Sequence, residues 1–76
     1  MKITILDDNR VLINKNDTNY LIEHDYISGT MIKSYYIYED IYNNLEHFID
    51  PDNEDKYFYN ECGDLIEAIK MIQEEE

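Results

Sequence analysis

The sequence predicts one α+β domain, residues 1–76, in which an antiparallel sheet of four to five short strands is covered by two α-helices, in the order ββββαβα. Short apolar stretches, one of them with clear period-two alternation, fill the first half of the chain, and apolar residues at helical spacing occur twice in the second half. The chain has 76 residues, and 43% of them are hydrophobic. That composition provides for one small core and argues against intrinsic disorder.

Four strands are expected before residue 39, and each is followed by residues that are typical of turns. The expected strands are 3–6, 11–14, 20–27 and 31–38. Asp7, Asp8 and Asn9 supply the first turn, and polar residues at 15–19 supply the second. Gly29 lies in the third turn, where it is free to take a positive φ. Short turns of this kind predict an antiparallel meander.

A first helix is expected over residues 40–49, with Asp40 as its N-cap. Its inward stripe consists of Ile41, Leu45, Phe48 and Ile49, and its outward acidic stripe consists of Glu39, Glu46 and Asp50. Pro51 disfavours helical backbone at the residue before it, so the helix is expected to stop there. An acidic loop at 52–55 and a short aromatic strand at 56–59 are expected to follow.

The last helix has the clearest local pattern in the chain. Asp64 to Glu67 has the form of a capping box, in which Asp64 takes the place of the usual Ser or Thr. The expected buried stripe is Leu65, Ala68, Ile69 and Ile72. Glu67 and Glu74 fall on the opposite face of this helix, and the glutamates at 74–76 are expected to form a frayed tail.

Negative charge is concentrated in residues 39–76. This half has thirteen acidic residues against Lys56 and Lys70, so its charge is 2 − 13 = −11, whereas the first half carries 4 − 5 = −1. A net charge of −12 exceeds what solubility requires of a small domain. The charge predicts either an anionic surface for a cationic partner or a solvated acidic face without a partner.

Composition also argues against several classes of function. No apolar stretch approaches the length of a signal peptide core or of a membrane span. Nucleic-acid phosphates and anionic lipid surfaces would repel this chain, so neither is an expected partner. The lone Cys62 cannot form an intramolecular disulfide, which favours a reducing cytoplasm, here that of a bacterial host.

No pattern in the sequence predicts an enzymatic activity, a metal site or a cofactor. His24, His47 and Cys62 are far apart in the sequence and lack paired ligand spacing. Acidic residues at 50, 52, 54 and 61 match four ligand positions of an EF-hand loop. Asp55 stands where that loop needs glycine, so a chance match in an acidic chain is the preferred interpretation, although calcium binding stays open.

Eight tyrosines are more than the interior of a small sheet requires. Most are expected to be half-buried strand residues, because tyrosine favours pleated surfaces. Tyr36 and Tyr38 share one face of the predicted strand 31–38, next to the acidic helix, and tyrosine is enriched at interface hot spots. An acidic surface with aromatic residues at its centre suits a partner rich in Lys and Arg.

The acidic residues 39–55 and the closing helix that begins at Asp64 give the chain a resemblance to the small acidic anti-CRISPR proteins of phages and mobile elements, which act as DNA mimics. The resemblance is one of type, without a diagnostic motif. It implies an inhibitor whose carboxylates occupy the basic nucleic-acid groove of a partner such as a CRISPR effector nuclease. The expected partner-binding residues are Glu39, Asp40, Glu46, Asp50, Asp52, Glu54, Asp55, Glu67, Glu74, Tyr36 and Tyr38. The alternative is a homo-oligomeric structural or regulatory module that uses the tyrosine-rich sheet face, and a homodimer is left open.

Overall fold

A five-stranded antiparallel sheet forms the frame of the molecule, and its strands are ordered in space as they are in the sequence. The computed structural model describes residues 1–75. The strands are β1 (Lys2–Asp7), β2 (Arg10–Lys15), β3 (Thr18–Tyr26), β4 (Lys33–Glu39) and β5 (Tyr57–Cys62). A single helical turn, α1 (Leu45–Phe48), lies between β4 and β5, and α2 (Leu65–Gln73) follows β5. The predicted α+β class and antiparallel sheet are confirmed.

The three hairpin turns follow the chemistry of their residues. Asp7 Oδ1 accepts a hydrogen bond of 2.9 Å from the backbone N–H of Asn9 in the first turn. Asn16 and Asp17 form a two-residue turn in which both φ angles are positive, 51° and 65°, as the favoured hairpin turn requires. Gly29 has φ of 77° at the tip of the β3–β4 hairpin, as expected from the sequence.

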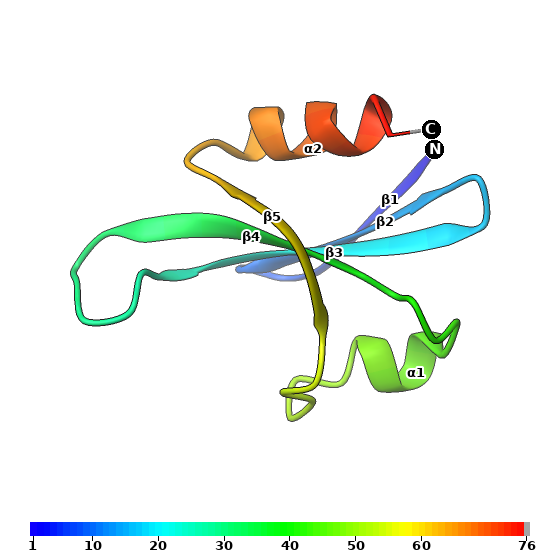
Figure 1. The fold of residues 1–76 in the computed structure, drawn as a ribbon, viewed down its shortest axis with the longest axis horizontal. Coiled ribbons are helices and arrows are strands. Elements are labelled where there is room, and N and C mark those ends of the chain that lie inside the picture. Colours follow the sequence, from blue (N-terminus) through cyan, green and yellow to red (C-terminus); the bar gives the residue numbers. More distant parts are fainter. Residues whose placement is uncertain (76) are drawn as a thin grey trace.

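The two helices lie on opposite faces of the sheet, as Figure 1 shows. On the α2 face, Ala68 and Ile72 pack into a cluster with five buried sheet residues, which are Ile13, Tyr20, Ile22, Ile37 and Cys62. Leu21 is also fully buried, although it lies between Tyr20 and Ile22 and therefore points to the other face. The middle of β3 is thus covered on both sides, which explains why three consecutive residues of this strand are buried.

The helix expected over 40–49 is wrong in extent. Its N-cap is Asn44, whose side chain accepts a hydrogen bond from the N–H of His47, and Asp40 is not a cap. Asn43 has φ of 53°, which interrupts any helix that would begin earlier. The outward stripe of Glu39, Glu46 and Asp50 is therefore wrong as well, because Glu39 ends β4 and Asp50 follows α1.

The closing helix has the predicted N-cap and the predicted buried face, but within residues 1–75 the Glu67 side chain makes no return hydrogen bond to Asp64, so the predicted capping box is only half present. Asp64 is the N-cap, and its carboxylate accepts a hydrogen bond of 3.0 Å from the N–H of Ile66. Its other end is held by Lys15 of β2, whose Nζ donates to the carbonyl oxygens of Ile72 and Gln73 at 2.9 and 2.6 Å. A cation at this end satisfies carbonyl groups that have no partner within the helix.

Neither of the two helices in the described residues is long and apolar enough to cross a membrane.

Candidate functional site

The segment between β4 and β5 carries a dense group of carboxylates, and we call residues 40–55 the acidic loop. It lies on the sheet face opposite α2, where the green and yellow-green part of the ribbon in Figure 1 contains α1. Six of the predicted site residues belong to it: Asp40, Glu46, Asp50, Asp52, Glu54 and Asp55. All of them except the half-buried Asp40 are exposed.

Buried groups hold the backbone of the acidic loop against the sheet. Phe48 is only 4% exposed. Arg10 of β2 donates a hydrogen bond of 2.8 Å to the carbonyl oxygen of Ile49. The buried Asn53 donates to the carbonyl oxygen of His47 at 3.0 Å, and its own side-chain oxygen accepts from the N–H of Asp55 at 2.9 Å. The loop therefore presents its carboxylates from a fixed backbone.

No ion pair within residues 1–75 neutralises the acidic loop. The two ion pairs of the described chain join Arg10 to Asp7 at 2.8 Å and Lys56 to Glu23 at 2.7 Å. Both acidic partners, Asp7 and Glu23, lie outside the loop. Asp40 also has one buried carboxylate oxygen without a hydrogen-bond partner among the described residues. The negative charge of the loop is thus available to an external cation.

Tyr38 lies at the border of the acidic loop, as the predicted site requires. It lines a shallow hollow together with Pro51 and Glu54. The ammonium group of Lys56 lies 5.6 Å from the centre of its ring, and the ring of Phe58 meets it edge-on with the two centroids 6.2 Å apart. Burial raises the pKa of Tyr38, and nearby carboxylates raise it further. Its hydroxyl group therefore stays protonated, and it can donate a hydrogen bond at neutral pH.

Tyr36 shares this face of the sheet, two residues before Tyr38. Its neighbour across the ladder is Glu61 of β5. Burial raises the pKa of Tyr36 as well, and Glu61 adds to the effect. Both tyrosines of the predicted site thus lie on the face that carries the acidic loop.

The structure does not bring all the predicted carboxylates together. Glu67 and Glu74 belong to α2 and its C-cap, on the opposite side of the sheet from the acidic loop (Figure 1). Glu39 lies opposite Tyr20 at the end of β4, so its side chain points to the α2 face, and it borders a narrow groove that Asp40 and Asp55 also line. The predicted surface thus divides into the acidic loop on one face and Glu67 and Glu74 on the other, with Glu39 at the end of β4 pointing to the α2 face.

That groove contains aromatic residues that the sequence interpretation did not assign to the site. Tyr42 is 72% exposed and Tyr57 is 54% exposed, and Ile41 is exposed although it was expected to face inward. The pair Asn43-Asn44 is the signal in the sequence that could have revealed them. Asparagine tolerates positive φ and favours caps and turns, so two in succession argue against a continuous helix there.

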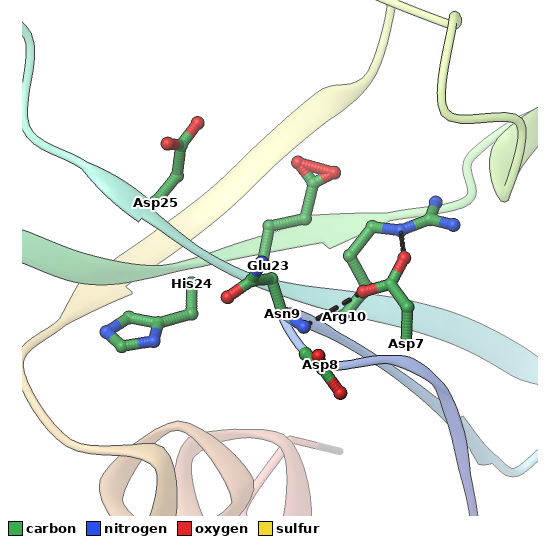
Figure 2. A pocket seen from close by; sticks show the side chains of 7 residues that line it. All are labelled: Asp7, Asp8, Asn9, Arg10, Glu23, His24 and Asp25. Atoms are coloured by element: carbon green, nitrogen blue, oxygen red, sulfur yellow. Dashed lines mark hydrogen bonds and ion pairs between the residues drawn. The ribbon is translucent and has the colours of Figure 1, made fainter.

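A second hollow lies where the β1–β2 turn meets β3, and Figure 2 shows the seven residues that line it. The Arg10 guanidinium donates to Asp7 and lowers the pKa of that carboxyl. His24 points away from Glu23 and Asp25, and its ring stacks on Tyr35 with the centroids 4.2 Å apart. Within residues 1–75, no group of three or more His, Cys, Asp or Glu side chains is arranged to hold a metal ion.

The residues considered for other chemistry have structural roles. Cys62 is buried, its thiol donates to the carbonyl oxygen of Asp64 at 3.3 Å, and burial raises its pKa. A thiol in this setting is a poor nucleophile. Glu61, the twelfth position of the EF-hand match, lies within β5, so the loop does not lead into a second helix as an EF-hand does.

Comparison with known protein families, with curated proteins and with solved structures gives no match.

Proposed function

We propose that this chain is a non-enzymatic inhibitor that uses the acidic loop to occupy a basic, nucleic-acid-binding groove of a partner protein. The observation that carries the proposal is the group of six loop carboxylates that no cation of residues 1–75 neutralises. Because Phe48, Asn53 and Arg10 fix the loop backbone, a partner would not have to order it on binding.

The chemistry of such a groove matches the loop. A groove for duplex DNA is built to meet about one negative charge per 1.7 Å of helix axis. Carboxylates on a folded loop are sparser than phosphates, so the loop would replace only part of a bound strand. Tyr38 lies at the border of the loop, and Tyr42 and Tyr57 line the narrow groove of this chain beside Asp40. These three side chains would offer aromatic faces to Lys and Arg side chains of the partner.

The resemblance to anti-CRISPR proteins names the class of partner to test first, a CRISPR effector nuclease loaded with its guide RNA. Such an enzyme holds its duplex in a positively charged channel. Capture of proteins from a bacterial lysate, with elution by salt, would extend the search to other nucleic-acid-binding proteins.

The decisive experiment compares two variants that change the net charge equally. Asp52→Lys with Glu54→Lys alters the loop, and Glu67→Lys with Glu74→Lys alters α2 on the other side of the sheet, so each variant has a charge of −12 + 4 = −8. None of these four side chains donates or accepts a hydrogen bond within residues 1–75, so both variants should fold.

We expect the wild-type protein to displace the target duplex from the nuclease in a gel-shift assay. The loop variant should inhibit at least about tenfold less, because like charge would now meet the groove, while the α2 variant stays close to wild type. Raising the salt concentration should weaken wild-type inhibition steeply. Equal loss in both variants would show that the loop is not the site. If the nuclease bound this protein and its target duplex at the same time, the nucleic-acid groove could not be the binding site.

A further inference from the structure

The outer strand β1 is an open edge of the sheet, and its central residues carry no charge, proline or bulge that would oppose pairing with another chain. Edge strands are commonly protected by charged residues, prolines or bulges, and in β1 the charged residues Lys2 and Asp7 stand at the two ends. The centre of β1 is Ile3-Thr4-Ile5, and the register shift of this strand lies beyond Ile5, near the turn. Ile5 is 77% exposed and Ile3 is 49% exposed.

These two isoleucines extend the face of the sheet that α2 covers. Ile3 is opposite Ile13, and Ile5 is opposite Val11, and residues opposite each other in an antiparallel pair point to the same side. Ile13 belongs to the core beneath α2, and Val11 packs against it. The apolar surface therefore continues from the core to the open edge, where helix α2 no longer covers it.

The same two residues direct their backbone groups away from the sheet. The backbone N–H of His24 donates to the carbonyl oxygen of Asn9, directly before β2, and this bond continues the ladder between β2 and β3. The backbone groups of Asn9 and of the other odd-numbered residues of this segment therefore bond to β3. Hydrogen-bonded pairs alternate along a ladder, so even-numbered residues of β2 bond to β1. Their partners on β1 are Lys2 and Thr4. The backbone groups of Ile3 and Ile5 then face outward.

We propose that β1 pairs with β1 of a second copy of this chain, so that two sheets join into one of ten strands. A two-fold axis at Thr4 sets Ile3 of one copy opposite Ile5 of the other. In this register the outward backbone groups of Ile3 and Ile5 meet their counterparts, and four isoleucines form one apolar cluster on the α2 face. The opposite faces, which carry the acidic loops, need not contact each other.

Charge along β1 favours a second copy over an unrelated strand. The strand begins with Lys2, and it ends with Asp7, followed by Asp8 in the turn. Antiparallel pairing about Thr4 sets the positive start of each strand beside the negative end of the other. The first half of the chain also carries little of the charge, −1 of the total of −12. The proposed interface thus uses the part of the molecule that repels another copy least.

The first test is the oligomeric state, measured by sedimentation equilibrium from about 5 to 500 µM, because so small an interface is expected to be weak. We expect wild-type protein to form dimers in this range. Ile5→Lys should raise the dissociation constant at least about tenfold, because symmetry introduces the charge twice at the centre of the edge. Ile66→Lys is the matched control, since Ile66 is 63% exposed on α2, away from the edge. A monomer throughout the range, or equal dimerisation of all three proteins, would overturn the proposal.

The second test examines the register. Thr4 would face Thr4 of the other copy at a position where backbone groups do not pair, with Cα atoms about 4.5 Å apart. That distance falls within the range that a disulfide spans, about 4.4 to 6.8 Å. Thr4→Cys should therefore give a disulfide-linked dimer under oxidation, whereas the wild type, whose only thiol is the buried Cys62, should not. If the variant dimerises without forming this link, the pairing about Thr4 is wrong. Neither test involves the proposed inhibitor function.

Discussion

Tyr59 links the C-terminal segment to the sheet. Its hydroxyl group donates to the carboxylate of Glu75, and its ring lies against Tyr20 with the centroids 5.7 Å apart. The hydrogen bond to Glu75 is the main reason that the pKa of Tyr59 rises to about 12 from the ordinary value of 10.0, and burial adds to it. The last described turn of the chain is thus linked to β5 through one phenol.

This raised pKa predicts a specific dependence of stability on pH. A tyrosine whose pKa is higher in the folded than in the unfolded protein contributes stability that is fully present below the unfolded pKa. The contribution of Tyr59 should therefore be complete below pH 10 and should disappear as the pH rises to about 12. Urea unfolding of the wild type and of Tyr59→Phe across this pH interval measures the contribution. The difference between their free energies of unfolding cancels the effects of the other tyrosines, which both proteins share. A constant difference between the proteins would contradict the shift.

Asn53 is the buried polar residue that organises the acidic loop. It is only 9% exposed, and it both donates to His47 and accepts from Asp55. Asn53→Ala would leave two backbone groups without these partners, so we expect a loss of about 1–3 kcal/mol in the free energy of unfolding. Asn60→Ala is the control, because Asn60 is exposed and, within residues 1–75, its side chain accepts only from the adjacent N–H of Glu61. This change should alter stability by less than about 0.5 kcal/mol. Similar losses in the two variants would contradict this role.

At the scale of elements, the sequence predicted those whose pattern is local and regular. The hairpin turns and the N-cap of α2 are set by neighbouring residues, and both are present in the structure. The strand expected at 20–27 is also present as β3, but it is not half-buried as its alternation predicted, because Tyr20, Leu21 and Ile22 are all buried. The helix at 40–49 was wrong because its apolar spacing persists through Asn43, where the backbone takes a positive φ. The burial of Phe48 against the sheet holds the shorter turn, and such tertiary contacts cannot be seen from local spacing.

Helix α2 allows a test of its N-cap with a control of equal charge. Asp64→Ala removes the acceptor for the N–H of Ile66, and loss of an N-cap costs about 1 kcal/mol. For a domain of this size, the thermal midpoint should fall by about 4–8 °C. Asp52→Ala removes the same charge from a side chain with no hydrogen bond among the described residues, so its midpoint should not fall. Equal midpoints for the two variants would mean that the cap contributes nothing to stability.

At the scale of the whole molecule, the sequence located the charge along the chain but not in space. The acidic half follows β4, and the chain then adds β5 to the same sheet before it forms α2 on the other face (Figure 1). Carboxylates that are close in sequence, such as those of the acidic loop, stay together. Glu67 and Glu74 end on the far side because β5 intervenes. Which face a helix covers depends on packing across the sheet, and composition and spacing do not contain that information.

The excess of negative charge predicts that salt stabilises the fold. Between about 50 and 500 mM salt the Debye length falls from about 14 Å to about 4 Å, which screens repulsion between exposed carboxylates. With only two ion pairs in residues 1–75, little attraction is lost by the same screening. We therefore expect the thermal midpoint of the wild type to rise across this range.

A graded series at two loop positions identifies the cause of that rise. Asp52→Asn with Glu54→Gln changes the net charge to −12 + 2 = −10, and the two lysine replacements change it to −12 + 4 = −8. Both positions are exposed, so packing stays nearly the same while repulsion decreases in two steps. The midpoint at low salt should rise from wild type to the neutral pair to the lysine pair, and the dependence on salt should weaken in the same order. Calorimetry measures both quantities. An equal salt dependence of the thermal midpoint in all three proteins would mean that the repulsion does not come from the acidic loop. A wild-type midpoint that falls with salt would show that attraction between charges outweighs repulsion in the folded protein.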